Sequence, residues 1–257
     1  MDLELVGRSV VVTGGSSGIG LATARLLLAE GALVTICGRD ENRLKTAEAD
    51  LGHRRLRAVR ADVVDPGEAA HVVAAAIEHG GRLDGVAAVA GHGRPGSLLE
   101  LEPSVTIDEV SDKLLALLNV VRPAMAALRE TSGAIVALTA PTGFEPQPEM
   151  GAIGVGRAAL ANAVRVLALE LAADRVRVNA VGVGLIDTPR QMQRHAGNST
   201  EQSYVDWLAI EAERRATPLG RAGTADEVAR AIGYLLSPQA GFTTGAVVDV
   251  TGGHRSN

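Results

Sequence analysis

Strand-like and helix-like segments alternate along the whole chain, and this alternation constrains the fold more than any other feature. Such alternation is typical of βαβ units, which build a parallel sheet. Because the strand-like segments are continuously apolar, we expect helices to cover both faces of that sheet. The expected strands lie at 9–13, 33–37, 56–60, 85–90, 133–139, 176–181 and 246–250, and the expected helices at about 18–30, 41–51, 66–80, 105–130, 152–173 and 225–236. The sequence therefore predicts an α/β fold with a doubly wound, seven-stranded parallel sheet.

The alternation continues without a second domain. The chain has 257 residues, 46% of them hydrophobic, and carries no charge block or low-complexity tract, so we expect one domain over 1–257. The segment 187–218 departs from the pattern because it is polar and long for a connection, and it contains the only tryptophan, Trp207. We expect it to form a partly helical substrate lid.

Charge and cysteine content exclude several classes of function. The 30 acidic and 25 basic residues give a net charge of -5, whereas binding a phosphate backbone needs a basic face, so we expect no nucleic-acid partner. Cys37 is the only cysteine, which rules out an intramolecular disulfide, provides no cysteine-based metal site and fits a cytoplasmic location. No run of 18 apolar residues and no export signal is visible, so we expect no membrane partner.

A glycine-rich turn stands directly between the first strand and the first helix, in the segment VVVTGGSSGIGLATARLLLAEGA. In this context glycines let the backbone turn tightly and approach a pyrophosphate, whose charge lies at the helix N-terminus. We expect a dinucleotide site here, and the alternative is a turn that binds nothing. The predicted contacts in this loop are Gly14, Ser16, Ser17, Gly18, Ile19 and Gly20.

The end of the second strand, CGRD at 37–40, predicts which dinucleotide is bound. An NAD-specific site places an acid near the ribose 2′-hydroxyl, but Gly38 stands there and Arg39 follows. A guanidinium can pair with a 2′-phosphate, so NADP(H) is favoured over NAD(H). The alternative is a surface role for Arg39. Asp62, followed by Val63, is placed to accept a hydrogen bond from an adenine amino group or to begin a helical turn.

Six segments in order resemble the short-chain dehydrogenase/reductase family over essentially the whole chain. They are TGGSSGIG (13–20), Asp62, AG (90–91), RVNAV (177–181), GLIDTP (184–189) and LLSPQAGFTTGAVVDVTGG (235–253). The resemblance implies a Rossmann-type sheet, a dinucleotide at the C-terminal ends of the strands, and a homodimer or homotetramer. It also implies that Thr188 contacts the nicotinamide carboxamide and that Ala90, Gly91 and Ile186 belong to the cofactor site.

The residues that carry the family's chemistry are missing. The family uses a tyrosine, a lysine four residues later, a serine thirteen residues before the tyrosine, and an asparagine in the preceding long helix. At these positions the chain has Ile153, Arg157 and Ala140, with Lys113 in place of the asparagine, or Val110 if a gap is allowed. The resemblance therefore implies the location of the active site and, at the same time, the loss of its usual proton relay.

The helix that starts at this location also begins with an unusual sequence, GAIGVGRAAL. Gly154 and Gly156 lie inside its first turns, although glycine costs about 1 kcal/mol relative to alanine in a helix interior. Two explanations remain open. The helix packs closely against a neighbour at these glycines, or the glycines serve the site.

The substitutions predict slow ordinary ketone reduction. Losing a general acid costs roughly 10²- to 10⁴-fold and losing an oxyanion donor roughly 10²- to 10³-fold. Arg157 can donate to the nicotinamide ribose but, unlike lysine, cannot relay a proton. Lys113 is a substitute acid if it points inward and a surface charge if it points outward. His92 is an acid or base near neutral pH, or a solvated loop residue. Weaker candidates are Glu145, Glu149, Asp187, His195 and Tyr204; Thr139 is expected to face away.

Two functional hypotheses follow. In the first, the chain is an atypical NADP(H)-dependent enzyme that acts on a small carbonyl, hydroxy or other metabolite-type substrate. Its reaction is then hydride transfer with a substitute acid, or a non-redox dehydration, isomerisation or cyclisation. In the second hypothesis, the chain is a catalytically inactive dinucleotide-binding or partner subunit. The polar and aromatic segment 187–218 favours the enzyme, because an inactive subunit has no need of a substrate lid.

Overall fold

The computed structural model describes residues 2–198 and 201–254. Seven strands form one sheet in the order β3-β2-β1-β4-β5-β6-β9, and every neighbouring pair is parallel. Their bounds are β1 Ser9–Thr13, β2 Leu33–Gly38, β3 Leu56–Arg60, β4 Gly85–Ala88, β5 Ala134–Thr139, β6 Arg177–Val183 and β9 Val247–Val250. The predicted doubly wound, seven-stranded sheet is confirmed.

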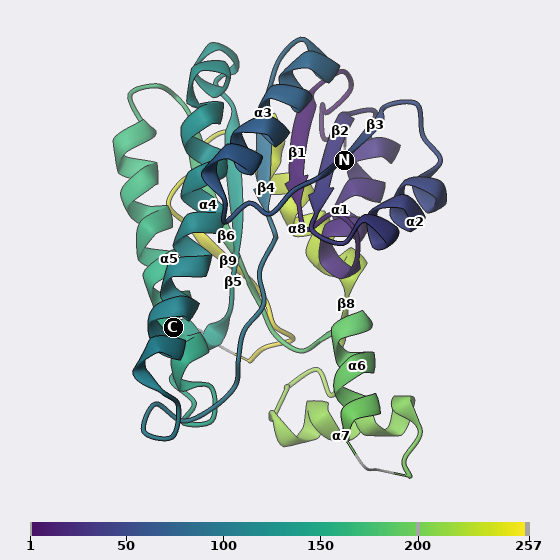
Figure 1. Ribbon diagram of the computed structural model, residues 1–257, viewed down its shortest axis with the longest axis vertical. Coiled ribbons are helices and arrows are strands. Elements are labelled where there is room, and N and C mark those ends of the chain that lie inside the picture. The colour runs from purple at the N-terminus through teal and green to yellow at the C-terminus, as the bar shows by residue number, and fades with distance from the viewer. Residues whose placement is uncertain (1, 199–200, 255–257) are drawn as a thin grey trace.

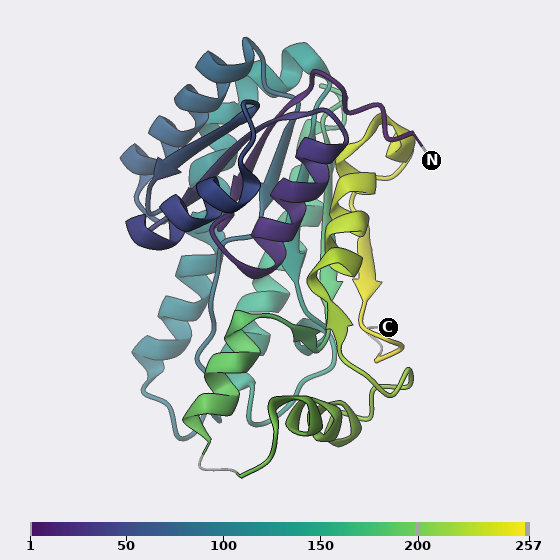
Figure 2. The same ribbon diagram turned by 90° about the vertical axis from the view of Figure 1, so that its right-hand side faces the viewer.

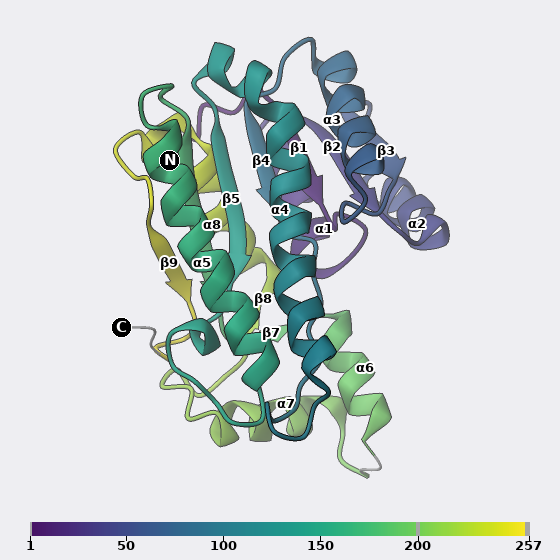
Figure 3. The ribbon, with the colours of Figure 1, turned by 60° about the vertical axis from the view of Figure 1, so that its left-hand side comes forward.

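Helices cover both faces of this sheet (Figures 1 and 3). One apolar core lies beneath α1, α2 and α8, and the other lies beneath α3, α4 and α5. The bounds are α1 Gly18–Ala29, α2 Glu41–Leu51, α3 Pro66–Gly80, α4 Pro103–Thr131, α5 Gly151–Leu171 and α8 Ala225–Leu236, with short 3-10 turns η1 Pro141–Gly143 and η2 Pro238–Ala240. The five inner strands β1, β2, β4, β5 and β6 are largely buried on both faces, which explains their continuously apolar sequences, whereas the edge strands β3 and β9 are more exposed.

Several helices begin and end where their capping residues predict. Asp40 accepts a hydrogen bond from the N–H of Arg43 at the start of α2, and that helix ends at Gly52 in the left-handed conformation. At the start of α8, Thr224 and Glu227 form a reciprocal capping box, and the resulting hydrogen bonds with Arg221 and Thr224 lower the pKa of Glu227 to about 2. Local sequence therefore sets these boundaries.

The strand order determines where a ligand can bind. The chain runs outward from β1 through β2 to β3, then returns to β4 on the other side of β1. Loops leaving the carboxyl ends of β1 and β4 therefore diverge to opposite faces of the sheet and leave a crevice between them. Open α/β sheets bind their ligands at such a switch point.

The lid segment, residues 187–218, extends beyond one end of the sheet (Figures 1 and 2). It contains α6 Pro189–Gly197 and α7 Tyr204–Arg214, and two short strands, β7 Ile186–Asp187 and β8 Gly223–Thr224, connect it to the body of the domain. The segment is partly helical, as expected. Its residues 199–200 lie outside the described residues, as do residue 1 and residues 255–257 of the predicted domain.

Helix α5 is the one helix in the described part of the chain that is long and apolar enough to cross a membrane, by length and composition only. Its most apolar window has a mean hydropathy of 1.4. The helix packs against α4, β5 and β6, and Leu160, Val164 and Leu171 belong to the core on that side of the sheet. A core helix of an α/β domain has this same composition, so the finding is weak evidence for a membrane span.

Candidate functional site

A cleft of about 920 Å³ opens at the carboxyl ends of β1, β4 and β5 and extends to the lid segment. It is lined by the loops that follow these strands, the start of α5 and the first turns of α6. The cleft brings together all the residues that the sequence predicted for the cofactor: Gly14, Ser16, Ser17, Gly18, Ile19, Gly20, Arg39, Asp62, Val63, Ala90, Gly91, Arg157, Ile186 and Thr188.

The glycine-rich loop is packed so closely at Gly14 and Gly20 that neither position can carry a side chain. Gly14 has a φ of +69°, and a Cβ there would lie 3.0 Å from the Cα of Ala90. A Cβ on Gly20 would overlap the carbonyl oxygen of Gly14. Helix α1 starts beside the loop, and its N-cap residue Ser17 forms no side-chain cap, which leaves the first amides of the helix open to the cleft. This arrangement fits an anionic pyrophosphate.

Strand β4 ends two residues earlier than predicted, and the cause is a side chain of β1. The hydroxyl of Thr13 accepts hydrogen bonds from the main-chain N–H groups of Val89 (3.1 Å) and Ala90 (3.0 Å). These amides therefore turn toward β1 and do not continue the ladder with β5. The turn carries Ala90 and Gly91 into the cleft opposite the glycine-rich loop.

The far end of the cleft carries two arginines, Arg39 and Arg43, each of which faces an aspartate. A Cβ on Gly38 would lie 2.9 Å from the hydroxyl oxygen of Ser16, so a side chain at this position would require Ser16 to shift. Arg39 follows, with its side chain 65% exposed and 3.7 Å from the carboxylate of Asp62. Arg43 also lines this end. The other carboxylate oxygen of Asp62 accepts the N–H of Val64 (3.1 Å), so the turn role predicted for this residue is present.

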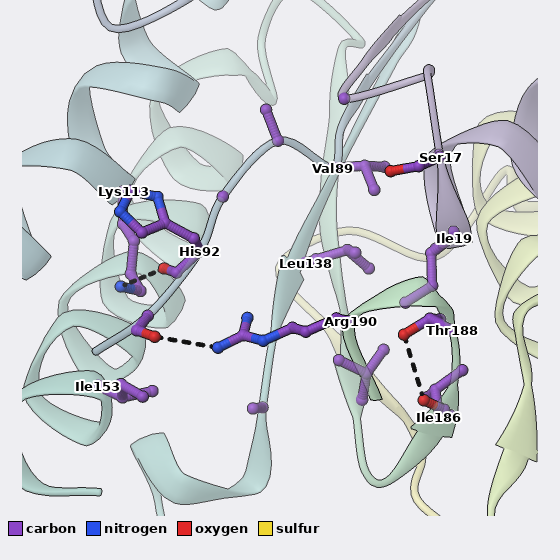
Figure 4. Close-up of a pocket in the computed structure, with 18 of the residues that line it drawn as sticks. Ser17, Ile19, Val89, His92, Lys113, Leu138, Ile153, Ile186, Thr188 and Arg190 are labelled. Carbon is purple, nitrogen blue, oxygen red and sulfur yellow. Dashed lines mark hydrogen bonds between the residues drawn. The ribbon is translucent and has the colours of Figure 1, made fainter. Parts of the chain in front are cut away.

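A buried ion pair on α4 lies at the opposite end of the cleft. The ammonium of Lys113 donates to the carboxylate of Glu109, and each side chain is only 4% exposed. Lys113 also approaches the main-chain carbonyl of His92 (3.4 Å; Figure 4), while Glu109 accepts the N–H of Arg94 (2.8 Å). Burial lowers the pKa of Lys113, and the hydrogen bond to Glu109 opposes this effect. Of the two predicted orientations, Lys113 adopts the inward one.

Apolar residues occupy the positions of the family's tyrosine and serine. Ile153 lies on the first turn of α5 and packs toward Gly93, whose added Cβ would lie 2.8 Å from the Ile153 side chain. Ala140 follows β5 and also lines the cleft. Arg157 directs Nη1 at the carbonyl of Leu138 (2.5 Å), and burial lowers its pKa to about 10. The guanidinium therefore binds the main chain, although Arg157 also lines the cleft.

The two glycines of α5 have a packing explanation. A Cβ on Gly154 would lie 2.8 Å from the carbonyl oxygen of Thr142. A Cβ on Gly156 would lie 2.8 Å from the carbonyl oxygen of Glu109 and 3.0 Å from the Cδ of Lys113. Close packing therefore accounts for both, and at Gly156 it makes room for the buried lysine.

The remaining sequence candidates are dispersed. The imidazole of His92 is exposed at the edge of the cleft. Tyr204 donates to the carboxylate of Asp187 (2.5 Å) within the lid segment. The carboxylate of Glu145 is 3.7 Å from His254, and the main-chain carbonyl of Glu149 accepts the N–H of Gly96. The ring of His195 packs against Tyr204 and Trp207. The hydroxyl of Thr139 donates to the carbonyl of Arg157. Thr139 faces away from the cleft, as strand alternation predicted.

Sequence reasoning missed three residues at this end. Glu109 stands four residues before Lys113, a spacing that signals an ion pair on a helix. Thr142 lines the cleft and has a buried hydroxyl without a hydrogen-bond partner among the described residues. Arg190 reaches across the cleft to the carbonyl of Gly93 (3.0 Å; Figure 4), and nothing in its local sequence signals this. Within residues 2–198 and 201–254, no group of three or more His, Cys, Asp or Glu side chains is arranged to hold a metal ion.

Comparison with known proteins identifies the family. Residues 14–255 match the family model described as enoyl-(acyl carrier protein) reductase. The chain is 36% identical over 251 residues to cis-4-hydroxycyclohexanecarboxylate dehydrogenase of Sinomonas cyclohexanicum, covering 96% of each chain. It is 31% identical over 258 residues to human dehydrogenase/reductase SDR family member 2, covering 96% of this chain and 86% of the relative. The chain belongs to the short-chain dehydrogenase/reductase family.

A solved structure of this family matches the whole fold. It is the NADPH-bound short chain oxidoreductase from Pseudomonas aeruginosa PAO1, described as containing an atypical catalytic center. The two chains are 36% identical, with a TM-score of 0.92, and the match covers 98% of each. Membership and these neighbours support oxidoreductase chemistry with a nicotinamide dinucleotide in a short-chain dehydrogenase/reductase fold.

Proposed function

We propose that this protein is an NADP(H)-dependent oxidoreductase that interconverts a small carbonyl compound and its alcohol, with Lys113 as the proton donor and acceptor. The observation that carries the proposal is the buried ion pair of Lys113 and Glu109. It lies at the end of the cleft where the family's tyrosine and lysine have been replaced by Ile153 and Arg157. Lys113 is a buried titratable cation that lines this part of the cleft.

The residues present fit a dinucleotide. The open start of α1 and the side-chain-free surface at Gly14 and Gly20 suit the pyrophosphate. Arg39 and Arg43 suit a 2′-phosphate, and Gly38 offers no carboxylate to a 2′-hydroxyl, which favours NADP(H). When bound, the nicotinamide supplies or accepts the hydride of the reaction.

The chemistry of the lysine suits the missing step. A lysine loses its proton more readily when it is buried, whereas an arginine keeps its proton under all working conditions. Burial lowers the pKa of Lys113 toward the range in which an acid can exchange its proton. In the reduction direction, the ammonium gives its proton to the carbonyl oxygen as that carbon gains hydride, and the neutral amine regains a proton from solvent. The carboxylate of Glu109 orients the amine.

The test combines cofactor binding with turnover. NADPH and NADH are titrated against the protein by fluorescence, and NADPH consumption is then followed with a panel of cyclic and linear ketones. The panel includes 4-oxocyclohexanecarboxylate, the ketone that corresponds to the alcohol named for the Sinomonas relative. Lys113→Met is compared with Lys45→Met, because Lys45 is the other lysine of the chain and forms an exposed pair with Glu41 (2.7 Å).

We expect NADPH to bind more tightly than NADH, and Lys113→Met to lose roughly 10²- to 10⁴-fold in kcat while Lys45→Met keeps its activity. The double variant Glu109→Gln/Lys113→Met removes both charges and shows whether a loss reflects chemistry or folding, since it should still bind NADPH. Failure of both cofactors to bind at millimolar concentration would refute the cofactor assignment. Unchanged kcat in Lys113→Met would refute the role of the lysine. Binding without NADPH consumption on the whole panel, and without any product by mass, would favour a noncatalytic dinucleotide-binding subunit.

A further inference from the structure

The end of the cleft beside Lys113 is lined by four arginines. Arg157 comes from α5, Arg190 and Arg194 from α6, and Arg215 directly follows α7. Arg190 and Arg194 stand four residues apart and therefore share one face of α6. The Arg39 end of the cleft is built from other elements, β2 and the start of α2.

The acid that Arg194 and Arg215 contact is already shared between several cations. The carboxylate of Glu211 is 9% exposed and lies 3.3 Å from Arg194, 3.4 Å from Arg215 and 3.2 Å from Arg214. One negative charge thus faces three guanidinium groups. Glu109 also acts on Arg157 and Arg190, but it is paired with Lys113, so the four arginines and Lys113 still outnumber Glu109 and Glu211.

Among the described residues, Arg157 and Arg190 bind main-chain carbonyl groups and not carboxylates. Each donates to a main-chain carbonyl, Arg157 to Leu138 (2.5 Å) and Arg190 to Gly93 (3.0 Å), and in the described part of the chain neither forms an ion pair. The Nε atoms of Arg157 and Arg215 are buried with no hydrogen-bond partner among the described residues. A buried donor without a partner is destabilising, and a bound acceptor can remove that cost.

The pKa values of these arginines reflect the crowding of like charges. Burial, and after it the charge of Arg190, lowers the pKa of Arg157. Desolvation and then Arg194 lower the pKa of Arg190, and burial and then Arg194 lower that of Arg215. An anion bound among them would oppose each of these like-charge effects.

Arg190 is placed for the substrate. Its guanidinium extends across the cleft from the Thr188 side toward the segment that carries His92 and Gly93 (Figure 4). The features that suit the phosphates lie elsewhere, at the glycine-rich loop and at Arg39. Arg190 therefore lies near Lys113, where the reacting carbonyl has to lie if Lys113 exchanges the proton.

We propose that the substrate carries an oxyanion, either a carboxylate or a phosphate, and that Arg190 binds this group from the lid segment. The inference rests on the proposed function, because it takes the reacting carbon to lie beside Lys113. A guanidinium offers two parallel N–H donors to an oxyanion, which makes a stronger partner than the carbonyl of Gly93. The expected substrates are small oxo or hydroxy acids, or their phosphate counterparts.

Calorimetric titration of the NADP⁺-loaded protein with matched probes tests this proposal. The carboxylate pair is 4-oxocyclohexanecarboxylate and 4-oxocyclohexanecarboxamide, and the phosphate pair is dihydroxyacetone phosphate and dihydroxyacetone. The variants are Arg190→Gln, Arg190→Lys and, as a control, Arg214→Gln. Arg214 also contacts Glu211, but its side chain is 66% exposed and does not line the cleft.

We expect the anion of at least one pair to bind at least about tenfold more tightly than its neutral partner. Charge-assisted hydrogen bonds contribute roughly 1.5–3 kcal/mol, so Arg190→Gln should weaken binding of that anion roughly 10- to 100-fold. Arg190→Lys should restore part of it and Arg214→Gln should leave it unchanged. The pair that shows the preference identifies the carboxylate or the phosphate.

Three results would overturn the inference: no preference for the anion in either pair, an equal preference in Arg190→Gln, or an equal loss of NADP⁺ affinity in that variant. The last would assign Arg190 to the cofactor and leave the proposed function intact. Failure of NADPH to bind would refute the proposed function separately. The same probe pairs are then titrated into protein without cofactor. There too, tighter binding of the anion that is lost in Arg190→Gln supports the inference, and equal binding of anion and neutral probe overturns it.

Discussion

Removing the charge of Glu109 should destabilise the protein more than removing that of Lys113. Both side chains are buried, and Arg157 and Arg190 lie close enough to Glu109 for its charge to act on their pKa values. In Glu109→Gln, Lys113 loses its hydrogen-bonded carboxylate and keeps the charge of Arg157 nearby, which the charge of Asp112 opposes. In Lys113→Met, Glu109 keeps these two arginines as neighbours. The structure therefore predicts an unequal cost for the two halves of one ion pair.

The size of the larger effect has an upper bound. Breaking a buried pair by removing one partner costs about 3–5 kcal/mol. Lys113 can instead fold as a neutral amine. Starting from its ordinary pKa of 10.5, deprotonation at pH 7 costs at most about 5 kcal/mol, and less because burial already lowers that pKa. We therefore expect about 3–4 kcal/mol for Glu109→Gln, about 2 kcal/mol for Lys113→Met, and less than the sum of these for the double variant.

The pH dependence tests the cause. In Glu109→Gln the folded state releases the proton of Lys113, whereas the unfolded state keeps it up to pH 10.5. The unfolded state then binds more protons, so the free energy of unfolding rises with pH. Relative to the wild type, the deficit of Glu109→Gln should shrink between pH 7 and 9 by up to about 1.4 kcal/mol per pH unit. Lys113→Met lacks the group and should show no such recovery.

Urea unfolding at a fixed protein concentration measures these values, with the four chains of the double-mutant cycle compared at pH 7, 8 and 9. If each single variant loses less than about 1 kcal/mol of unfolding free energy and the two losses add in the double variant, the ion pair is not buried and coupled as described. A deficit of Glu109→Gln that stays constant with pH would refute the argument that its cause is an uncompensated ammonium.

Three further predictions concern other parts of the molecule. Gly20→Ala should abolish NADPH binding in a fluorescence titration, because its Cβ would overlap the main chain of Gly14, whereas Gly197→Ala, with open space around it, should bind as the wild type does. Burial raises the pKa of Cys37 to about 12, so iodoacetamide at pH 8 should modify it only after unfolding, as mass spectrometry will show. Tyr204→Phe removes the hydrogen bond to Asp187 and should lower stability by about 1 kcal/mol, measured by thermal unfolding; an unchanged Tm would contradict that contact.

The sheet and the cofactor end of the cleft could be predicted because their signals are local. Continuous apolar strands, capping residues and a glycine-rich turn between a strand and a helix act within a few residues of one another. The early end of β4 could not be predicted in this way. It depends on the hydroxyl of Thr13, which is distant in sequence and reaches the amides of Val89 and Ala90 only after the strands have paired.

The orientation of Lys113 was open in the sequence for a similar reason. A glutamate four residues before a lysine occurs on exposed and buried helix faces alike, and only the packing of α4 against α5 decides between them. Arg190 was missed because its position depends on the path of the lid segment. Its contact with Gly93 joins residues that are 97 positions apart.

The loss of the family's proton relay and the start of α5 have one structural explanation. A lysine on α4 can point into the cleft only if the facing turn of α5 leaves space for its stem. At Gly156 that space exists, since a Cβ there would meet both the Cδ of Lys113 and the carbonyl of Glu109. A tyrosine at position 153 would have to replace Ile153, which already packs toward Gly93 beside this ion pair. The glycine, the isoleucine and the buried lysine therefore fit together at one place, and a tyrosine at position 153 would have to fit beside the ion pair that this packing already accommodates.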